Sequence, residues 1–168
     1  TNLKIFKNLN KNKLKNNSYE DLHKWSVNKK SEFWSSIWDY TKIKGSKIKP
    51  ILENKNDFFN SIFFKNSKIN FTLNLLNKNN NDDAIVFFSE QNFQRRVTWK
   101  KLNKYVNIIS IFLKENNIKK KDRVAAILPN IPETIISFLA TAKIGATWSS
   151  CSPDFGPKAI IDRFKQIN

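Results

Sequence analysis

The sequence predicts an α/β fold over its second half, preceded by a helical segment that is rich in aromatic residues. From about residue 82 onward, short apolar runs of strand type alternate with longer patterns of helical period. Strand, helix and strand follow at a spacing that favours parallel pairing with right-handed crossovers. Before that, bulky apolar residues recur about four positions apart, as on one helix face. The 168 residues are enough for one domain of ordinary size.

The composition divides the chain into three zones. Residues 1–17 are rich in Lys and Asn and low in complexity, and we expect a flexible basic arm there. Residues 18–80 carry aromatic clusters and form the predicted helical N-terminal extension. Residues 81–168 hold the alternating strands and helices and form the predicted α/β domain.

The clearest helical pattern of the extension follows Ser31, which is the expected N-cap. Its apolar residues share one helix face: Phe33, Trp34, Ile37 and Trp38. Gly45 and Pro50 then break the pattern. A second aromatic cluster comes next and consists of Phe58, Phe59, Phe63 and Phe64.

A hairpin and a long helix open the α/β part. Residues 84–88 are an apolar strand, and residues 95–97 are its expected partner across a short turn. Thr98 then caps the strongest helix of the chain. Asn116 and Asn117 end this helix, because Asn tolerates the left-handed conformation of a helix C-terminus.

A strand–helix–strand unit follows. Residues 124–128 are a continuous apolar strand that Pro129 stops, and Pro132 opens the next helix. Residues 146–150 are the third strand, and Pro157 starts a final helix. The residues of that helix expected to face inward are Ile160, Ile161, Phe164 and Ile167. We expect the parallel strands and the hairpin to form one small sheet covered by helices.

The formal charge of +16 points first to nucleic acid or an anionic membrane. However, only 4 of the 30 basic residues are Arg, which nucleic-acid sites favour for bidentate contacts. The abundant Lys, Asn, Ile and Phe share A/T-rich codons, so a biased genome composition accounts for the charge. We therefore expect no specific nucleic-acid partner. A basic module that binds nucleic acid or a membrane surface is the alternative from another functional class.

The sequence contains one Cys and one His. An internal disulfide is therefore excluded, and Cys151 and His23 alone cannot build a zinc site, so we expect no metal ligands. The cysteine usage is consistent with a cytoplasmic location. No apolar run reaches the roughly 18 residues that a membrane span needs.

Known catalytic and nucleotide-binding motifs do not fit this sequence. Gly occurs at only three positions, so neither glycine-rich phosphate loop can be formed. Asp154-Phe155-Gly156 spells the magnesium-binding triplet of kinases, but the upstream kinase elements are missing. No spacing supports a triad of His23 with the Ser149-Ser150 pair, and Cys151 has no neighbouring base or cation to activate it.

Two stretches carry a resemblance to a known family. RVAAILPNIPE at residues 123–133 resembles a segment of the acyl-CoA synthetases of the adenylate-forming superfamily. Residues 139–156, and above all WSSCSPDFG at 148–156, look specifically like the acetoacetyl-CoA synthetases. The aromatic residues 19–38 and the element at 69–76 are similar to the N-terminal extension of these synthetases. The resemblance covers nearly everything after the predicted arm.

The resemblance implies an ATP-dependent acid–thiol ligase. Such an enzyme converts acetoacetate, ATP and CoA to acetoacetyl-CoA, AMP and pyrophosphate through an acyl-adenylate, with Mg²⁺ on the polyphosphate. The α/β part would be the first βαβα portion of the large adenylate-forming domain, which is truncated here. Another short-chain synthetase, of the acetyl or propionyl type, is the alternative within the family.

The same resemblance implies that the chain is an N-terminal fragment. The sequence begins at Thr1 and contains no Met, which agrees with a fragment or a processed chain. The family's catalytic and nucleotide-binding residues lie after this segment, so we expect none of them among residues 1–168. We expect the fragment alone to be inactive, to bind no cofactor tightly and to need the remainder of the same polypeptide.

One loop is a candidate for ligand contact. Ser152, Pro153, Asp154 and Phe155 follow the carboxyl end of a predicted parallel strand, where α/β sheets bind their ligands. We consider them a candidate loop close to substrate or CoA, and the alternative is a loop that only packs.

Two positions depart from the family pattern. The family usually has Gly where this chain has Asn117 and Lys121, and Asn66 also stands near an expected Gly. Asn can adopt the positive φ that Gly would supply, and Lys can do so at a cost.

Overall fold

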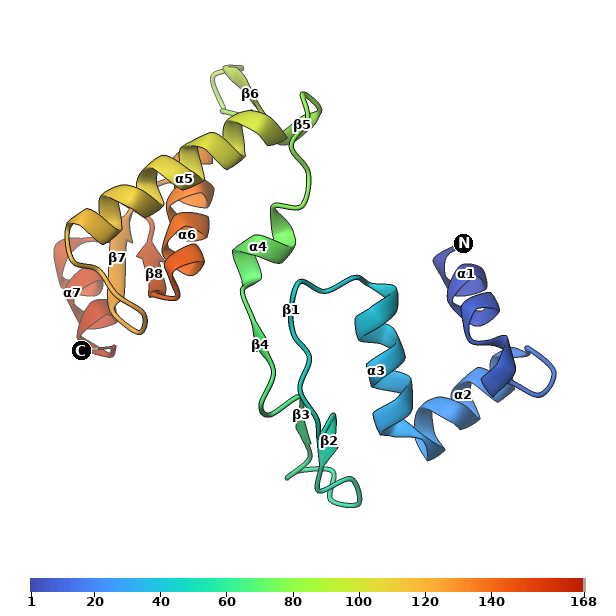
Figure 1. Cartoon of the computed structure of the whole chain (residues 1–168). Helices are drawn as coiled ribbons and strands as arrows, with labels where there is room; N and C mark the ends of the chain where they lie inside the picture. Colours follow the sequence, from blue (N-terminus) through green and yellow to red (C-terminus); the bar gives the residue numbers. More distant parts are fainter. Residues whose placement is uncertain (168) are drawn as a thin grey trace. The chain divides into compact units, whose positions relative to one another are not determined.

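The computed structural model describes residues 1–167, which form two compact units (Figure 1). The first unit comprises Thr1–Ile69, and the second begins at Asn70. Composition placed a predicted boundary at residue 81, inside a polar loop at residues 77–83. The structure divides earlier, because Asn70 and Thr72 already donate side-chain hydrogen bonds to carbonyl oxygens of the second unit.

The first unit begins with helices that pack around one tryptophan. They are α1 (Asn2–Leu9), the 3₁₀ turn η1 (Lys11–Lys13), α2 (Tyr19–Asn28) and α3 (Lys30–Tyr40). The buried residues of their shared core cluster are Phe6, Leu14, Leu22 and Trp25. The ring of Phe33 on α3 meets the ring of Trp25 edge-on at a centroid distance of 5.2 Å.

The structure differs from the flexible arm expected at residues 1–17. Asn2–Leu9 is helical, and the backbone N–H of Lys4 donates to the hydroxyl of Thr1 at 3.4 Å. Phe6 is only 4% exposed. A periodic pattern needs several apolar residues, whereas this segment is held mainly by Phe6 and Leu14 against α2 and α3. The composition of residues 1–17 therefore did not predict the helix Asn2–Leu9.

The predicted N-cap at Ser31 is wrong, because α3 starts at Lys30. Only Lys29 separates α2 from α3. Its N–H donates to the carbonyl of Trp25 at 2.9 Å, and its carbonyl accepts from the N–H of Phe33 at 2.9 Å. One residue thus ends one helix and opens the next without a side-chain cap.

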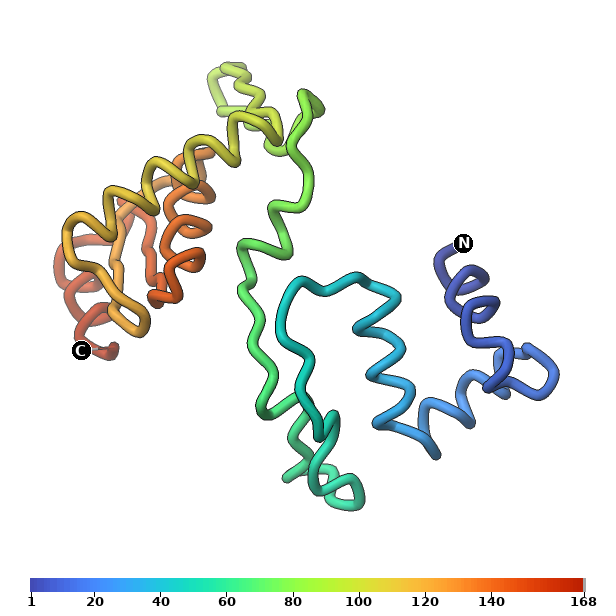
Figure 2. The backbone as a smooth tube through the Cα atoms, viewed as in Figure 1, coloured from blue at the N-terminus to red at the C-terminus, as the bar shows by residue number. Residues whose placement is uncertain are grey.

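Two nested antiparallel hairpins complete the first unit, as the tube in Figure 2 shows. Their strands are β1 (Gly45–Ser46), β2 (Leu52–Glu53), β3 (Ile62–Phe63) and β4 (Lys68–Ile69). β2 pairs with β3 inside the outer pair β1–β4. Ring contacts of Trp34 with Phe63 and of Trp38 with Phe64, at 5.6 and 5.0 Å, join the hairpins to α3.

The second unit opens with a short helix, a hairpin and a long helix. These are α4 (Phe71–Leu75), β5 (Asp83–Phe88), β6 (Gln94–Thr98) and α5 (Trp99–Glu115). The predicted hairpin is confirmed, since β5 and β6 pair antiparallel. The predicted cap is also confirmed: the hydroxyl of Thr98 accepts from the N–H of Lys101 at 3.2 Å.

The predicted parallel unit is confirmed as well. It consists of β7 (Arg123–Ile127), α6 (Pro132–Ile144), β8 (Thr147–Cys151) and the following α7 (Pro157–Lys165). β7 and β8 pair parallel from Arg123 opposite Thr147 to Ile127 opposite Cys151. Pro132 opens α6, and Gly145, at a φ of 80°, ends it.

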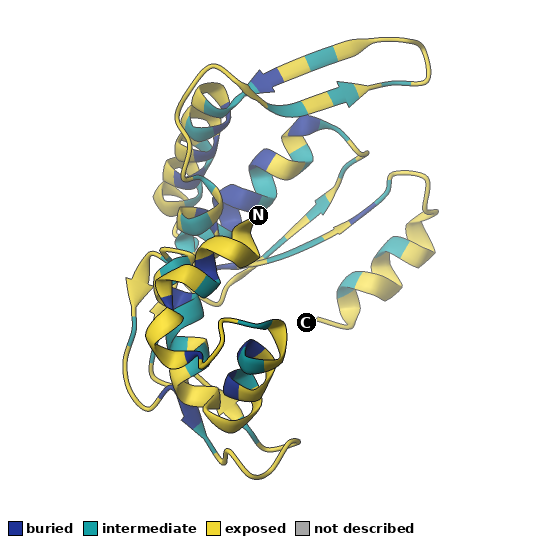
Figure 3. Cartoon of the chain, turned by 90° about the vertical axis from the view of Figure 1, so that its right-hand side faces the viewer, coloured by how far each residue is buried: buried dark blue, intermediate teal, exposed yellow. Residues whose placement is uncertain are grey.

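The core of the second unit lies between α5 and α6. Its buried residues, dark blue in Figure 3, are Val97, Leu102, Val106, Ile136, Leu139 and Ala140. Burial of a large aliphatic side chain of this kind stabilises the fold by roughly 1.5–3 kcal/mol. The hydroxyl of Thr72, itself fully buried, donates to the carbonyl of Leu139 at 2.8 Å and docks α4 on α6.

The expected single sheet is not formed. β5–β6 and β7–β8 are separate two-stranded sheets with no hydrogen bonds between them among the described residues. The 17 residues of α5 carry the chain roughly 25 Å from β6 before β7 begins. The hairpin and the parallel pair therefore share α5 and α6 as packing surfaces instead of a common ladder.

The prediction that α7 turns its apolar residues inward is wrong for the described chain. No residue of α7 is buried, and the helix carries only yellow and teal in Figure 3. Ile161 is 50% exposed. An amphipathic face is buried only where another element covers it, and the described part of the second unit provides no such element.

Both departures from the family glycines lie at left-handed positions. Asn117 has a φ of 62° and Lys121 a φ of 78°. Lys121 also donates its backbone N–H to the carbonyl of Gly145 at 3.0 Å, which ties the turn before β7 to the end of α6. The turn geometry is thus kept with a lysine in a conformation that costs a non-glycine residue about 1–2 kcal/mol.

We expect Lys121→Gly to raise the free energy of unfolding by about 0.5–1 kcal/mol. Glycine removes the left-handed strain of the folded state, but it also raises the entropy of the unfolded chain, which offsets part of the stabilisation. Thermal unfolding followed by circular dichroism measures the change. Asn117→Gly is the matched control and should shift the midpoint less, since Asn tolerates positive φ. A lower midpoint for Lys121→Gly would contradict the assignment of strain.

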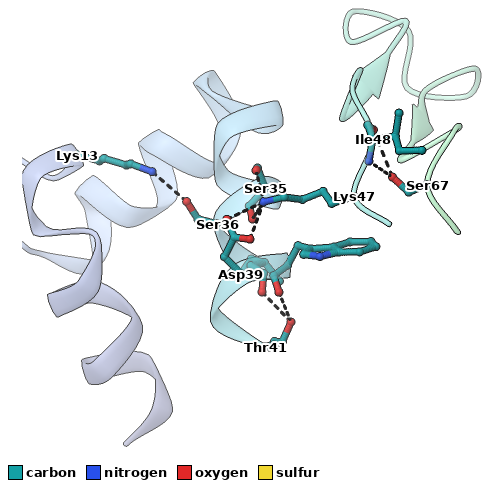
Figure 4. A network of polar contacts seen from close by, with 10 residues as sticks. Lys13, Ser35, Ser36, Asp39, Thr41, Lys47, Ile48 and Ser67 are labelled. Carbon is teal, nitrogen blue, oxygen red and sulfur yellow. Dashed lines mark hydrogen bonds and ion pairs between the residues drawn. The ribbon is translucent and has the colours of Figure 1, made fainter. Parts of the chain in front are cut away.

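Polar contacts brace the outer hairpin of the first unit (Figure 4). The ammonium of Lys47 donates to both carboxylate oxygens of Asp39 at 2.6 Å and to the hydroxyl of Ser35 at 3.1 Å. The hydroxyl of Ser67 accepts from the N–H of Ile48 at 2.9 Å and donates to its carbonyl at 3.3 Å. The pair β1–β4 has only two residues in each strand. The contacts of Lys47 attach the segment after β1 to α3, and those of Ser67 attach it to the segment before β4.

Close approach of the β1 and β4 backbones requires glycine at position 45. A Cβ on Gly45 would lie 2.5 Å from the carbonyl oxygen of Lys68. We expect Gly45→Ala to destabilise the first unit by about 1–3 kcal/mol, measured by urea unfolding. Gly156→Ala is the control, because a Cβ there meets no atom within 4 Å. Equal midpoints for the two variants would refute the steric argument.

Candidate functional site

The parallel pair β7–β8 ends where two loops leave the sheet side by side. Ile127 and Cys151 are the last paired residues, and the N–H of Leu128 extends the ladder by donating to the carbonyl of Cys151 at 3.2 Å. The loops that follow are residues 128–131 and 152–156. Ligands of open α/β sheets bind at this carboxyl edge, so these loops form the candidate site.

The first loop is anchored on the start of α6. The carbonyl of Pro129 accepts from the hydroxyl of Thr134 at 2.7 Å and from the N–H of Ile131 at 2.9 Å. Since α6 is packed in the core through Ile136 and Leu139, the loop takes its position from a rigid element.

The second loop is folded by its own polar groups. The hydroxyl of Ser152 donates to the carboxylate of Asp154 at 2.5 Å and accepts from the N–H of Asp154 at 3.3 Å. The N–H of Phe155 donates to the carbonyl of Ser152 at 3.3 Å. Pro153, Asp154 and Phe155 are exposed, and Ser152 is half-buried.

Positive groups lie next to this second loop. The guanidinium of Arg163 stacks over the ring of Phe155 at 4.4 Å from its centroid. Helix α7 begins at Pro157 after the N-cap Gly156, which supplies no side-chain cap, so the next N–H groups, of Lys158 and Ala159, are open to a ligand. Arginine, lysine at Lys158 and a helix N-terminus together favour a bound anion.

The predicted site residues meet at this edge, whereas the rejected candidates do not form a catalytic group. Cys151 is buried at the end of β8, which fits its expected packing role. His23 is exposed on α2. Sequence reasoning missed Arg163, because it stands eight positions after Phe155 and no local pattern joins a loop ring to the second turn of the next helix.

The described residues contain no cluster of three or more His, Cys, Asp or Glu side chains that could hold a metal ion. Asp154, the carboxylate of the candidate loop, is instead bonded to Ser152. A cation at this edge would therefore need ligands from a bound molecule or from further chain.

A hollow of about 360 Å³ lies elsewhere in the second unit, between β6, α5 and α6. Its floor is apolar, with Val97 and Ile136, and its rim carries an ion pair. The guanidinium of Arg95 donates to both carboxylate oxygens of Glu133 at 2.6 Å. This hydrogen bonding, which outweighs the opposing effect of burial, lowers the pKa of Glu133 below its usual 4.5. The residues that line this hollow are different from those of the two loops.

The family model described as "AMP-binding enzyme" matches residues 75–167, which is more than half of the chain. The matched segment includes both loops of the candidate site. The chain belongs to the AMP-binding enzyme family.

Within this family, the chain is similar to acetoacetyl-CoA synthetases. That of Rhizobium meliloti (strain 1021) is 41% identical over 149 residues, which cover 89% of this chain and 23% of the relative. That of Macaca fascicularis is 34% identical over 154 residues, with the same coverage. These relatives confirm the resemblance that the segment around residues 123–156 carried.

A solved structure shows the same relation. The acetoacetyl-CoA synthetase from Streptomyces lividans superposes with a TM-score of 0.76 at 28% identity, over 89% of this chain and 24% of that structure. The mixed helix and strand fold of this AMP-binding chain is thus confirmed. The chain spans about a quarter of the length of the relatives it matches. None of the helices described in residues 1–167 has the length and apolar character to cross a bilayer.

The ion pair between Arg95 and Glu133 predicts a pH dependence of stability. Because the pKa of Glu133 is lowered in the fold, the pair stabilises above pH 4.5, and this contribution is lost as the pH falls through the lowered value. The side chains are 38% and 50% exposed, so we expect Glu133→Gln to cost about 0.2–1 kcal/mol at pH 7 and progressively less as the pH falls below 4.5. Urea unfolding across this range measures it.

Glu115→Gln is the matched control for this experiment. Glu115 is the last residue of α5, the helix that packs against α6, and it forms no ion pair among the described residues. It should leave the pH profile unchanged. A profile for Glu133→Gln that parallels the unmodified chain at every pH would show that the ion pair is not linked to folding.

Proposed function

We propose that this chain is the N-terminal quarter of an acetoacetate–CoA ligase. The similarity to acetoacetyl-CoA synthetases over 89% of the chain is the observation that carries the proposal. The proposed reaction has two steps. The carboxylate of acetoacetate attacks the α-phosphorus of ATP and releases pyrophosphate, and the CoA thiol then attacks the acyl-adenylate carbonyl and releases AMP.

In this proposal, the carboxyl edge of β7–β8 lies near CoA or the acyl group. Support comes from the open N-terminus of α7 and from Arg163 beside the loop Ser152–Phe155, because both suit the phosphate groups of CoA. Mg²⁺ would neutralise the polyphosphate of ATP. Its protein ligands would come from the remainder of the polypeptide.

The chain alone is proposed to be inactive. The relatives are about four times as long, and neither glycine-rich phosphate loop can be formed from the three glycines present. The remainder of the polypeptide is thus its proposed first partner. An N-terminal extension followed by the start of the adenylate-forming domain, and a cytoplasmic location, remain part of the same proposal.

The acid substrate has one specific competitor. A malonamoyl-CoA synthetase of Penicillium aethiopicum is 32% identical over 158 residues. Acetoacetate and malonamate are both short acids with a second carbonyl carbon at position 3, so they differ only in a methyl or an amino group there. The 41% identity to the acetoacetyl-CoA synthetase of Rhizobium meliloti (strain 1021) favours acetoacetate.

A chimera tests the proposal. The matching N-terminal region of the Rhizobium meliloti synthetase is replaced by this chain, and pyrophosphate release with ATP and CoA is measured. We expect acetoacetate-dependent release by the chimera and none by this chain alone. The synthetase without its N-terminal region and the parent enzyme are the lower and upper controls.

Three outcomes would count against the proposal. Turnover by residues 1–168 alone would show that the catalytic machinery is already present. A folded chimera with no activity would show that this chain cannot serve as the N-terminal quarter of such a ligase. If the complete enzyme from the source of this chain preferred acetate or malonamate, that acid would replace acetoacetate as the proposed substrate.

A further inference from the structure

The connection between β2 and β3 carries two almost fully exposed aromatic rings. Within this Phe58–Phe59 loop, residues 54–61, Phe58 is 88% and Phe59 is 93% exposed. The rings meet edge-on at a centroid distance of 5.6 Å. The loop projects from the end of the inner hairpin (Figure 2). Adjacent apolar side chains this exposed indicate an interaction surface, because each leaves a large apolar area in water.

The loop holds the two rings outward through its own hydrogen bonds. The carboxylate of Asp57 accepts from the N–H groups of Phe59 and Asn60 at 3.1 and 3.2 Å and from the side-chain amide of Asn60 at 2.6 Å. These bonds, led by the side-chain amide, lower the pKa of Asp57. The hydroxyl of Ser61 donates to the carbonyl of Asp57 at 2.6 Å. A braced loop loses little entropy on binding.

Lysines rim the same loop. Lys29, Lys30 and Lys55 line one hollow of about 440 Å³ beside it, and the ammonium of Lys30 donates to the carbonyl of Lys55 at 3.3 Å. The acid of that hollow, Glu32, pairs with Lys13 at 3.3 Å. Within the described chain, none of the three lysines forms an ion pair with a carboxylate. Their charges therefore remain available to an anionic partner.

We propose that the Phe58–Phe59 loop and its lysines bind the surface of an anionic phospholipid bilayer. Phenylalanine rings at the tip would enter the interfacial region, and the ammonium groups would lie at the lipid phosphates. The first unit carries 15 Lys, no Arg and 6 acidic residues, which is a net charge of +9. The positive charge is complementary to the lipid phosphates, and the two phenylalanine rings are complementary to the apolar part of the same bilayer surface.

The observations favour lipid over the other anionic partner, nucleic acid. Single-stranded nucleic acid binds to flat aromatic platforms and to arginine. Here the two rings stand at 86° to each other, so they cannot stack in one run of bases, and the first unit has no arginine. A second copy of this chain is disfavoured as the partner by its own positive charge.

Flotation with lipid vesicles tests the proposal on the full chain of 168 residues. Vesicles of phosphatidylcholine with 30% phosphatidylserine (about a third anionic lipid) are compared with pure phosphatidylcholine. We expect binding to the anionic vesicles only. The double variant Phe58→Ser, Phe59→Ser should lower the partition coefficient by about tenfold or more, and each of Lys29→Gln, Lys30→Gln and Lys55→Gln by about fivefold.

Phe88→Ser is the matched control, because Phe88 is also exposed, at 65%, but lies on β5 of the other unit. It should bind like the unmodified chain. Circular dichroism verifies that each variant is folded, which is expected since the altered rings are exposed. Equal binding of the double variant would overturn the proposal in favour of charge alone. No binding to anionic vesicles, or loop-dependent binding to poly(U) or self-association instead, would also overturn it.

Discussion

The contact between α5 and α6 is the constraint on which the second unit depends. Val106 and Ala140 are fully buried in it and Leu139 nearly so. The hairpin strand β6 runs directly into α5, and β7 runs into α6 through one short loop, so this contact positions both small sheets. Thr72 adds α4 through a buried hydrogen bond to the carbonyl of Leu139. Two sheets of only two strands each could not be stable without it.

The same contact explains how the candidate site is held. The loop at residues 128–131 is bonded to α6 through Thr134, and the turn before β7 is bonded to the end of α6 through Lys121 and Gly145. Both ends of the parallel pair are therefore attached to one rigid helix. The loop Ser152–Phe155 depends instead on its own hydrogen bonds and on the ring contact with Arg163. An exposed, self-contained loop beside a rigid edge suits contact with a ligand.

Two exposed surfaces thus have different chemistry. The carboxyl edge combines an arginine, an uncapped helix end and polar loop atoms, which suit a phosphorylated ligand. The Phe58–Phe59 loop combines exposed aromatic rings with lysines that form no ion pair among the described residues, which suits an interface between water and lipid. They belong to separate units, and the experiments on one do not depend on the other.

Sequence by itself determined the family, the parallel pair, the cap at Thr98, the helix start at Pro132 and the place of the loop after β8, because these features depend on residues close together in the chain. It also located the left-handed positions Asn117 and Lys121. Tertiary structure alone decided the helix at residues 2–9, the separation of the two sheets, the exposure of α7 and the ring contact of Arg163. Each of these depends on which distant surface covers an apolar face or meets a side chain, and no local periodicity contains that information.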